Sequence, residues 1–125
     1  MKVCMIHSYK DLMVWQKAMD LVVEVYRIVQ LLPKEETYGL SDQMRRAAVS
    51  IPSNIAEGKM RNTKREYINF LYMARGSNAE LQTQCYICAR IHYVTEKELI
   101  KTLSLSNEVG RMINALILSL TKPNP

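Results

Sequence analysis

The stretch from Gln43 to Ser77 constrains the fold of this chain more than any other. An apolar pattern with helical spacing runs into Pro52, continues beyond it and stops at Gly58. A short basic connector, KMRNTKR, follows, and a second helical pattern begins at the capping-box sequence TKRE. Two helices joined by so short a connector pack as antiparallel neighbours.

The same helical spacing recurs along the rest of the chain. After a tail of residues 1–10, the predicted helices cover residues 11–32, 41–58, 63–93 and 95–121. Glycine and proline are scarce, at four each in 125 residues, which favours helices, and the length fits one domain. We therefore expect an all-α fold, an up-down-up-down antiparallel four-helix bundle.

Four residues are the expected N-terminal caps of these helices. Asp11 and Ser41 precede the first two helices, and a side-chain oxygen there can accept a hydrogen bond from the first turn. Thr63 and Thr95 each stand three residues before a glutamate, the signature of a capping box. Trp15 lies on the apolar stripe of the first helix, so we expect it in the core.

Special residues interrupt the second and third helices. Pro52 removes a backbone donor and clashes with the preceding turn, so we expect a kink near residues 49–51 or a helix break at Pro52. Gly58 is expected to end the second helix as its C′ residue. A mid-helix glycine such as Gly76 costs up to about 1 kcal/mol. Beside Ser77, it predicts a close approach by another helix.

The positive charge is concentrated in one connector. The chain has a net charge of +5, and residues 59–65 alone contribute +4. In an up-down-up-down bundle this connector shares one end with both termini. The cations gathered there are Lys2, Lys10, Lys59, Arg61, Lys64, Arg65 and Lys122. The charged residues of the other two connectors, at the opposite end, sum to −2.

Lys64 and Arg65 are placed against helix electrostatics. They lie in the first turn of the third helix, where the positive end of the dipole disfavours cations by about 0.3–1 kcal/mol each. Helix stability therefore does not explain them. Polyanion binding is one interpretation of the basic end, and a solvated charged loop is the alternative.

One group of residues has metal-ligand chemistry. Cys85, Cys88 and His92 recur at helical spacing and could bind zinc with His7 or Cys4 as a fourth ligand. The two cysteines could instead form a redox pair, although no strand precedes them. Packing in the core is the favoured interpretation, because free cysteines are commonly buried.

The motifs of common catalytic sites are absent from the sequence. It contains no glycine-rich phosphate loop, no HExxH, no nucleophile elbow, and no Glu-x-x-His pattern of the di-iron bundles. We therefore predict neither an enzyme nor a cofactor.

Composition also bears on the compartment. No apolar run approaches the roughly 18 residues that span a bilayer, and residues 1–10 hold no apolar segment of signal-peptide length. Three cysteines, an odd number, favour a reducing compartment over a disulfide framework. We expect a cytoplasmic protein that does not bind membranes.

Three segments resemble the 23S ribosomal RNA intervening-sequence protein family over about residues 8–120: DLMVWQKAMDLVVEVYRIV, LPKEETYGLSDQMRRAAVSIPSNIAEGKMR and REYINFLYMARGSNAELQTQ. The resemblance implies a small bacterial four-helix bundle that assembles as a homopentameric ring. It also implies kinship with the accessory variability determinant of diversity-generating retroelements, which binds nucleic acid and a reverse transcriptase through a basic surface. It implies no enzymatic activity.

The resemblance adds three basic positions, Arg45, Arg46 and Arg75. The first two join the basic connector as candidate nucleic-acid-binding residues. Each arginine could instead be structural, with Arg75 beside Glu80 and Arg46 beside Glu57 or a neighbouring subunit.

The expected function is non-enzymatic binding of nucleic acid, RNA above all, by an oligomer and without sequence specificity. The alternative is a scaffold or adaptor whose basic end meets an acidic protein partner.

Overall fold

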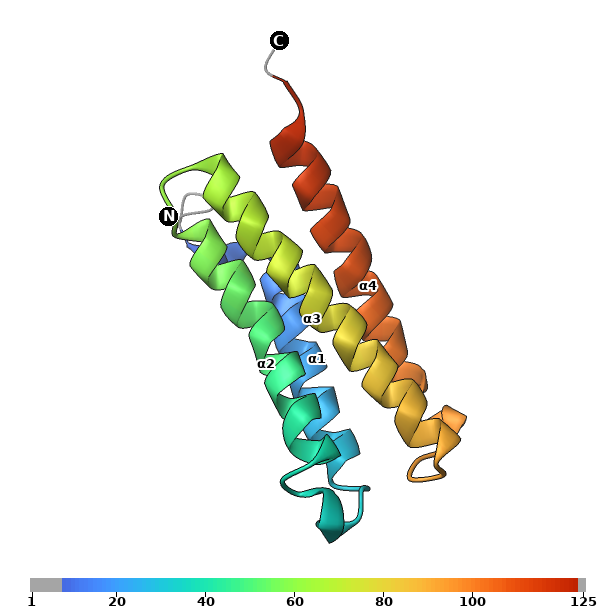
Figure 1. The fold of residues 1–125 in the computed structure, drawn as a ribbon. Helices are drawn as coiled ribbons and strands as arrows, with labels where there is room; N and C mark the ends of the chain where they lie inside the picture. The colour runs from blue at the N-terminus through green and yellow to red at the C-terminus, as the bar shows by residue number, and fades with distance from the viewer. Residues whose placement is uncertain (1–7, 124–125) are drawn as a thin grey trace, which may run out of the picture.

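The computed structural model describes residues 8–123, which form four long helices and no strand (Figure 1). The helices are α1 (Met13–Val29), α2 (Leu40–Lys59), α3 (Lys64–Arg90) and α4 (Glu96–Thr121), with single 3-10 turns at Tyr9–Asp11 and Lys34–Glu36. The α2–α3 connector lies at the same end as the start of α1 and the end of α4, and the other two connectors lie at the opposite end. The prediction of an all-α four-helix bundle is confirmed.

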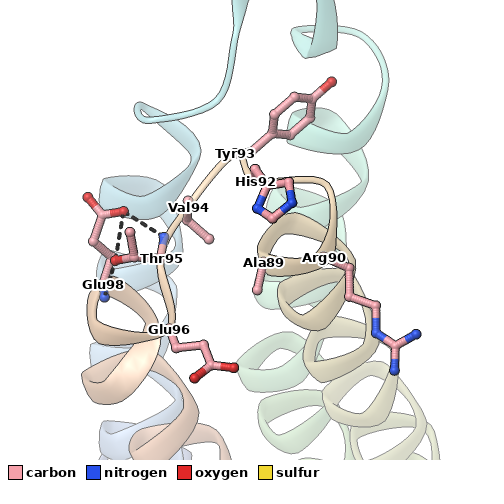
Figure 2. Close-up of a pocket in the computed structure, with 8 residues that line it drawn as sticks. All are labelled: Ala89, Arg90, His92, Tyr93, Val94, Thr95, Glu96 and Glu98. Atoms are coloured by element: carbon pink, nitrogen blue, oxygen red, sulfur yellow. Dashed lines mark hydrogen bonds between the residues drawn. The ribbon is translucent and has the colours of Figure 1, made fainter.

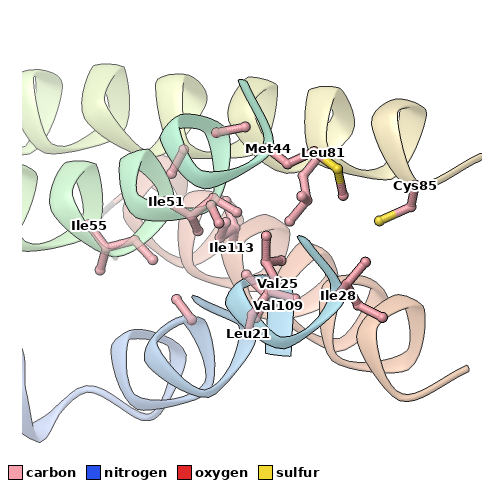
Figure 3. Packing of buried hydrophobic residues seen from close by; sticks show 14 of the residues in the cluster. Leu21, Val25, Ile28, Met44, Ile51, Ile55, Leu81, Cys85, Val109 and Ile113 are labelled. Atoms are coloured by element: carbon pink, nitrogen blue, oxygen red, sulfur yellow. The ribbon is translucent and has the colours of Figure 1, made fainter. Parts of the chain in front are cut away.

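The core lies between the four helices. Within the described residues each helix contacts its two antiparallel neighbours, whereas the diagonal pairs α1–α3 and α2–α4 make no close backbone contact. Figure 3 shows core side chains from all four helices, including Leu21, Val25, Ile51, Ile55, Leu81, Val109 and Ile113. Trp15 is only half-buried, at the edge of this core, where it packs edge-on against Tyr9. None of the described helices is both long and apolar enough to cross a membrane.

The N-terminal caps match the predictions at two helices. Thr95 forms a complete capping box, since its hydroxyl accepts from the Glu98 N–H (3.1 Å) and its own N–H donates to the Glu98 carboxylate (2.9 Å). Thr63 accepts from the Glu66 N–H at 3.2 Å, but the Glu66 carboxylate accepts from the Thr63 hydroxyl rather than from its backbone. The box at Thr63 is therefore only half formed.

The caps predicted for the first two helices are wrong. α1 begins at Met13, beyond the short 3-10 turn that contains Asp11. α2 begins at Leu40, one residue before Ser41. The free N–H of Leu40 is satisfied instead by the carboxylate of Glu36, which accepts from it at 3.0 Å. A residue of the connector thus replaces the local cap.

Two helices end earlier than the apolar pattern suggests. α1 ends at Val29 and continues as a tight turn rather than reaching residue 32. α3 ends at Arg90 because His92 adopts a left-handed conformation with a φ of 65°. The N–H groups of His92 and Tyr93 then bond back to carbonyls of α3, which is the Schellman pattern usually built around glycine.

α2 is continuous through Pro52, so the alternative of a helix break there is wrong, and the kink stays a prediction. Polar side chains stand two residues before and two residues after the proline in α2. The Asn54 amide donates to the Ser50 carbonyl at 2.8 Å, and the Ser50 and Ser77 hydroxyls are 2.8 Å apart across the α2–α3 interface. The segments SIPSNIAEG and ARGSNAEL are thus bonded directly to each other.

The close approaches between helices occur at glycines other than the one predicted. Gly58 lies inside α2 with a negative φ, so it is not a left-handed C′ residue. A Cβ there would lie 2.7 Å from Cβ of Phe70 on α3, whereas a Cβ at Gly76 would meet nothing within 4 Å. The prediction of a close approach at Gly76 is therefore wrong within the protomer, because Gly76 faces outward.

Between α3 and α4 the equivalent close contact involves a buried amide. Asn78 donates to the Ser106 carbonyl at 3.0 Å and accepts from the Ser106 hydroxyl at 2.7 Å. Gly110 leaves room for this amide, since a Cβ there would lie 3.2 Å from its nitrogen.

Candidate nucleic-acid interface

The basic end of the bundle is the end formed by the α2–α3 connector, with the four cations Lys59, Arg61, Lys64 and Arg65 (Figure 1). Lys59 is the last residue of α2, and Lys64 and Arg65 open α3. Lys10 in the first 3-10 turn and Lys122 just after α4 lie at the same end. Lys2, the seventh predicted cation, lies outside the described residues.

Two of the four cations are tied to neighbouring side chains. Arg61 pairs with Glu57 at 2.7 Å, lies 3.9 Å from Glu66, and stacks over the Phe70 ring with 4.8 Å to its centroid. The ammonium of Lys59 lies 5.9 Å from the centroid of the Tyr67 ring. The two carboxylates reduce the local charge of the four cations to +2.

Lys64 and Arg65 differ from these two. Both are exposed, and within residues 8–123 neither has an ion-pair or side-chain hydrogen-bond partner. They occupy the first turn of α3, where the helix dipole opposes them. Their charge is available to an external anion.

Arg45 and Arg46 do not join the basic end. Both lie near the start of α2, and the 14-residue separation from Lys59 corresponds to about 21 Å along the helix. Arg46 pairs with Asp42 at 3.0 Å, and Arg45 donates to the Thr37 carbonyl at 3.1 Å. The helical rise alone would have separated them from the basic connector.

Sequence reasoning missed the aromatic partners of the cations. The Arg75 guanidinium lies 4.8 Å from the centroid of the Tyr72 ring and donates to the Asn114 side-chain oxygen at 3.2 Å. The expected pairs of Arg75 with Glu80 and of Arg46 with Glu57 are wrong. The three-residue spacing of Tyr72 and Arg75 was visible in the sequence, but the stack of Arg61 on Phe70 depends on the path of the connector.

The cysteines are core residues. Cys85 and Cys88 are fully buried, and the Cys88 thiol lies 3.6 Å from the Met44 sulfur. Burial raises the pKa of the Cys85 thiol to about 12 and the pKa of the Cys88 thiol to about 11. Both are protonated at neutral pH, the state unsuited to nucleophilic attack or metal binding.

The predicted third ligand lies elsewhere. His92 is exposed beyond the end of α3 and does not share a helical face with the cysteines. Cys4 and His7 lie outside the described residues. Across residues 8–123 no group of three or more histidine, cysteine, aspartate or glutamate side chains is arranged to hold a metal ion.

The opposite end of the bundle carries a hollow of about 420 Å³ between the end of α3 and the start of α4 (Figure 2). Its lining residues are Ala89, Arg90, His92, Tyr93, Val94, Thr95, Glu96 and Glu98. The Glu98 carboxylate is engaged in the Thr95 capping box. The Thr95 hydroxyl also donates to the Glu98 carboxylate at 3.2 Å, so this hydroxyl and this carboxylate both serve the cap of α4.

Comparisons with known proteins identify the family. Residues 10–115 match the family described as 23S rRNA-intervening sequence protein. A solved structure of a protein of unknown function from the S23 ribosomal protein family of Bacteroides thetaiotaomicron has the same fold, with a TM-score of 0.77. It is 22% identical, and the match covers 83% of this chain and 97% of that one. No curated protein matches the chain in sequence. The chain therefore belongs to the 23S rRNA-intervening sequence protein family.

Proposed function

We propose that this protein is a non-enzymatic, oligomeric bundle that binds nucleic acid, RNA above all, through its basic end. The observation that carries the proposal is the pair Lys64 and Arg65. These cations are exposed, lack an ion-pair partner within the described residues, and occupy a position that destabilises their own helix. A phosphate backbone supplies the counter-charge that the fold does not.

Two further considerations favour RNA and non-specific binding. The family description refers to an intervening sequence of 23S rRNA, which makes RNA the polyanion to test first. The cations lie on a connector and at the start of a helix. They do not line one face of a helix that could enter a nucleic-acid groove and read its bases. Such contacts go to phosphates, which position a protein without reading bases.

The proposal includes self-association as a homopentameric ring. An apolar groove between α1 and α2, lined in part by Trp15, Met19 and Val49, is open to solvent. Ile100 and Leu118 are exposed on α4, away from that groove. Exposed apolar residues on two different sides of the bundle favour head-to-tail contacts, which form a ring when the rotation between neighbouring subunits closes. Such a ring would place the basic ends of its subunits side by side. We expect the native protein to have a mass near five times the 14.5 kDa of one chain.

The binding experiment compares two double variants that each remove two positive charges. Lys64→Gln with Arg65→Gln acts at the basic end, and Lys34→Gln with Lys97→Gln acts at the opposite end. We expect the first pair to lower RNA affinity about 10-fold or more at low salt, and the second pair to leave it near the wild-type value. Equal RNA affinity for the wild type and the first double variant would refute the proposal.

A protein-binding adaptor is the second candidate function. The open apolar groove between α1 and α2 favours it, because an exposed apolar patch commonly marks a protein interface. In this case the basic end meets an acidic protein. The resemblance to the accessory variability determinant separately implies a reverse transcriptase as a partner to test. Recovery of one acidic partner that resists nuclease treatment, and that is lost with Lys64→Gln and Arg65→Gln, would favour the adaptor.

A further inference from the structure

Cations stacked on aromatic rings are concentrated between the basic end and the middle of α3. Within residues 8–123 there are three such stacks, and all involve cations between Lys59 and Arg75. Significant cation–aromatic contacts occur about once per 70–80 residues in proteins. Three within 17 residues, beside the exposed cations Lys64 and Arg65, suggest a shared role.

The three stacks differ in their access to solvent. Tyr67 is only 8% exposed, so the stack with Lys59 is internal packing. Tyr72 lies on the outer surface of α3 and is 43% exposed. Its partner Arg75 is also held by Asn114 of α4, so the guanidinium is fixed beside the ring.

A second held guanidinium lies on the other side of α3. Arg61 stacks on the half-buried Phe70 and is paired with Glu57 of α2. One arginine–aromatic pair therefore lies toward α2 and the other toward α4. The first turn of α3, with its two exposed cations, precedes both rings along the helix.

The spacing along α3 suits a short nucleic-acid segment. Arg65 and Tyr72 are seven residues apart, which places them on the same side of the helix, about 10 Å apart along its axis. Asn69, also exposed, lies between them. A strand with a phosphate at Arg65 would bring a nearby base to the Tyr72 ring.

We propose that the basic end binds single-stranded nucleic acid, with phosphates at Lys64 and Arg65 and a base stacked on the Tyr72–Arg75 pair. This inference rests on the proposed function and specifies its substrate class. A duplex hides the faces of its bases, whereas unpaired bases stack on aromatic rings and guanidinium planes without sequence preference. The Arg61–Phe70 pair offers a second, smaller stacking surface.

The test uses fluorescence anisotropy with a labelled oligouridylate and an RNA duplex of the same length. Tyr72→Leu keeps an apolar side chain and removes the ring, and Tyr72→Phe keeps the ring. Tyr86→Leu is the matched control, since Tyr86 is 54% exposed on the same helix, about 21 Å nearer the opposite end. We expect Tyr72→Leu to weaken single-strand binding about 5-fold or more and to leave duplex binding unchanged. Tyr72→Phe and Tyr86→Leu should bind like the wild type.

The outcomes separate this inference from the proposed function. The inference would be overturned if the wild-type protein bound the duplex and the single strand with equal affinity. It would also be overturned if Tyr72→Leu bound the single strand as tightly as the wild type. In both cases a loss of binding in the Lys64→Gln and Arg65→Gln double variant would still support nucleic-acid binding by the basic end. Failure of the wild type to bind either probe would overturn both.

Discussion

The two ends of the bundle use their charged residues differently. At the end opposite the basic connector, carboxylates stabilise the fold. Glu36 accepts from the Leu40 N–H at 3.0 Å and from the Tyr93 hydroxyl at 2.9 Å, which joins the two connectors. These bonds lower the pKa of Glu36. Glu98 completes the cap of α4 through Thr95.

At the basic end two of the charges are not used in this way. Lys64 and Arg65 stabilise no helix end and, within the described residues, pair with no carboxylate. A charge with a structural partner is explained by the fold, whereas an exposed charge that opposes the helix dipole requires another explanation. The comparison therefore supports the proposal of a binding surface at the basic end.

The largest expected effect tests the packing beneath the basic end. Gly58→Ala would place a Cβ 2.7 Å from Cβ of Phe70, an atom that cannot move without shifting α3. We expect a loss of about 2 kcal/mol in the free energy of unfolding, measured by urea denaturation. Gly76→Ala is the control, because the space around Gly76 is open, and it should raise stability by up to about 1 kcal/mol. Wild-type stability for Gly58→Ala would show that α2 and α3 are not fixed at this contact.

The next effect concerns a carboxylate nearer the opposite end. Glu24 is buried, and hydrogen bonding to Arg27 is the largest cause that lowers its pKa. Burial raises the pKa by less than this, and Lys101 on α4 lowers it further. Its stabilisation is therefore present above the ordinary pKa of 4.5 and fades as the pH falls below it.

Glu24→Gln should lower stability by about 1 kcal/mol at pH 7 and reduce the further loss on acidification. Thermal unfolding from pH 7 to pH 3 measures both. An unchanged pH dependence would show that Glu24 contributes nothing through its charge.

The two threonine caps allow a direct comparison of the ends. Thr95→Ala removes a complete capping box and should cost about 1 kcal/mol. Thr63→Ala removes one backbone hydrogen bond at the basic end and should cost about half as much. Chemical denaturation of the two variants decides the order, and a larger loss for Thr63→Ala would reverse the comparison.

The last expected effect is a gain rather than a loss of stability. Replacing Lys64 and Arg65 by glutamine removes two unfavourable interactions with the helix dipole, each about 0.3–1 kcal/mol. The double variant should be slightly more stable than the wild type at low ionic strength, and the gain should shrink in salt. Destabilisation would mean that these side chains support the fold.

The sequence predicted the helices and part of the caps for a physical reason. The spacing of apolar residues reflects which side of each helix is buried, and Thr63 and Thr95 act within their own helical turn. The roles of Gly58 and Gly76 were not predictable in this way. They depend on how each helix is rotated relative to its neighbours, and the local pattern of apolar residues does not specify this rotation.

The residues of the candidate site likewise fall into those that the sequence predicted and those that it did not. The cluster from Lys59 to Arg65 was predictable because its cations are close together in the sequence. In the structure they lie at one end of the bundle. Arg45 lies at the other end of α2, as its distance along the helix requires. The stack of Arg61 on Phe70 required the conformation of the connector, and no local pattern encodes it.

The salt dependence of RNA binding tests the central claim most directly. For single strands, each phosphate contact contributes about 0.7 to the slope of the logarithm of the binding constant against the logarithm of salt concentration. If Lys64 and Arg65 each contact one phosphate, their replacement by glutamine should reduce the magnitude of this slope by about 1.4. A slope equal to that of the wild type would contradict the assignment of the binding surface to the basic end.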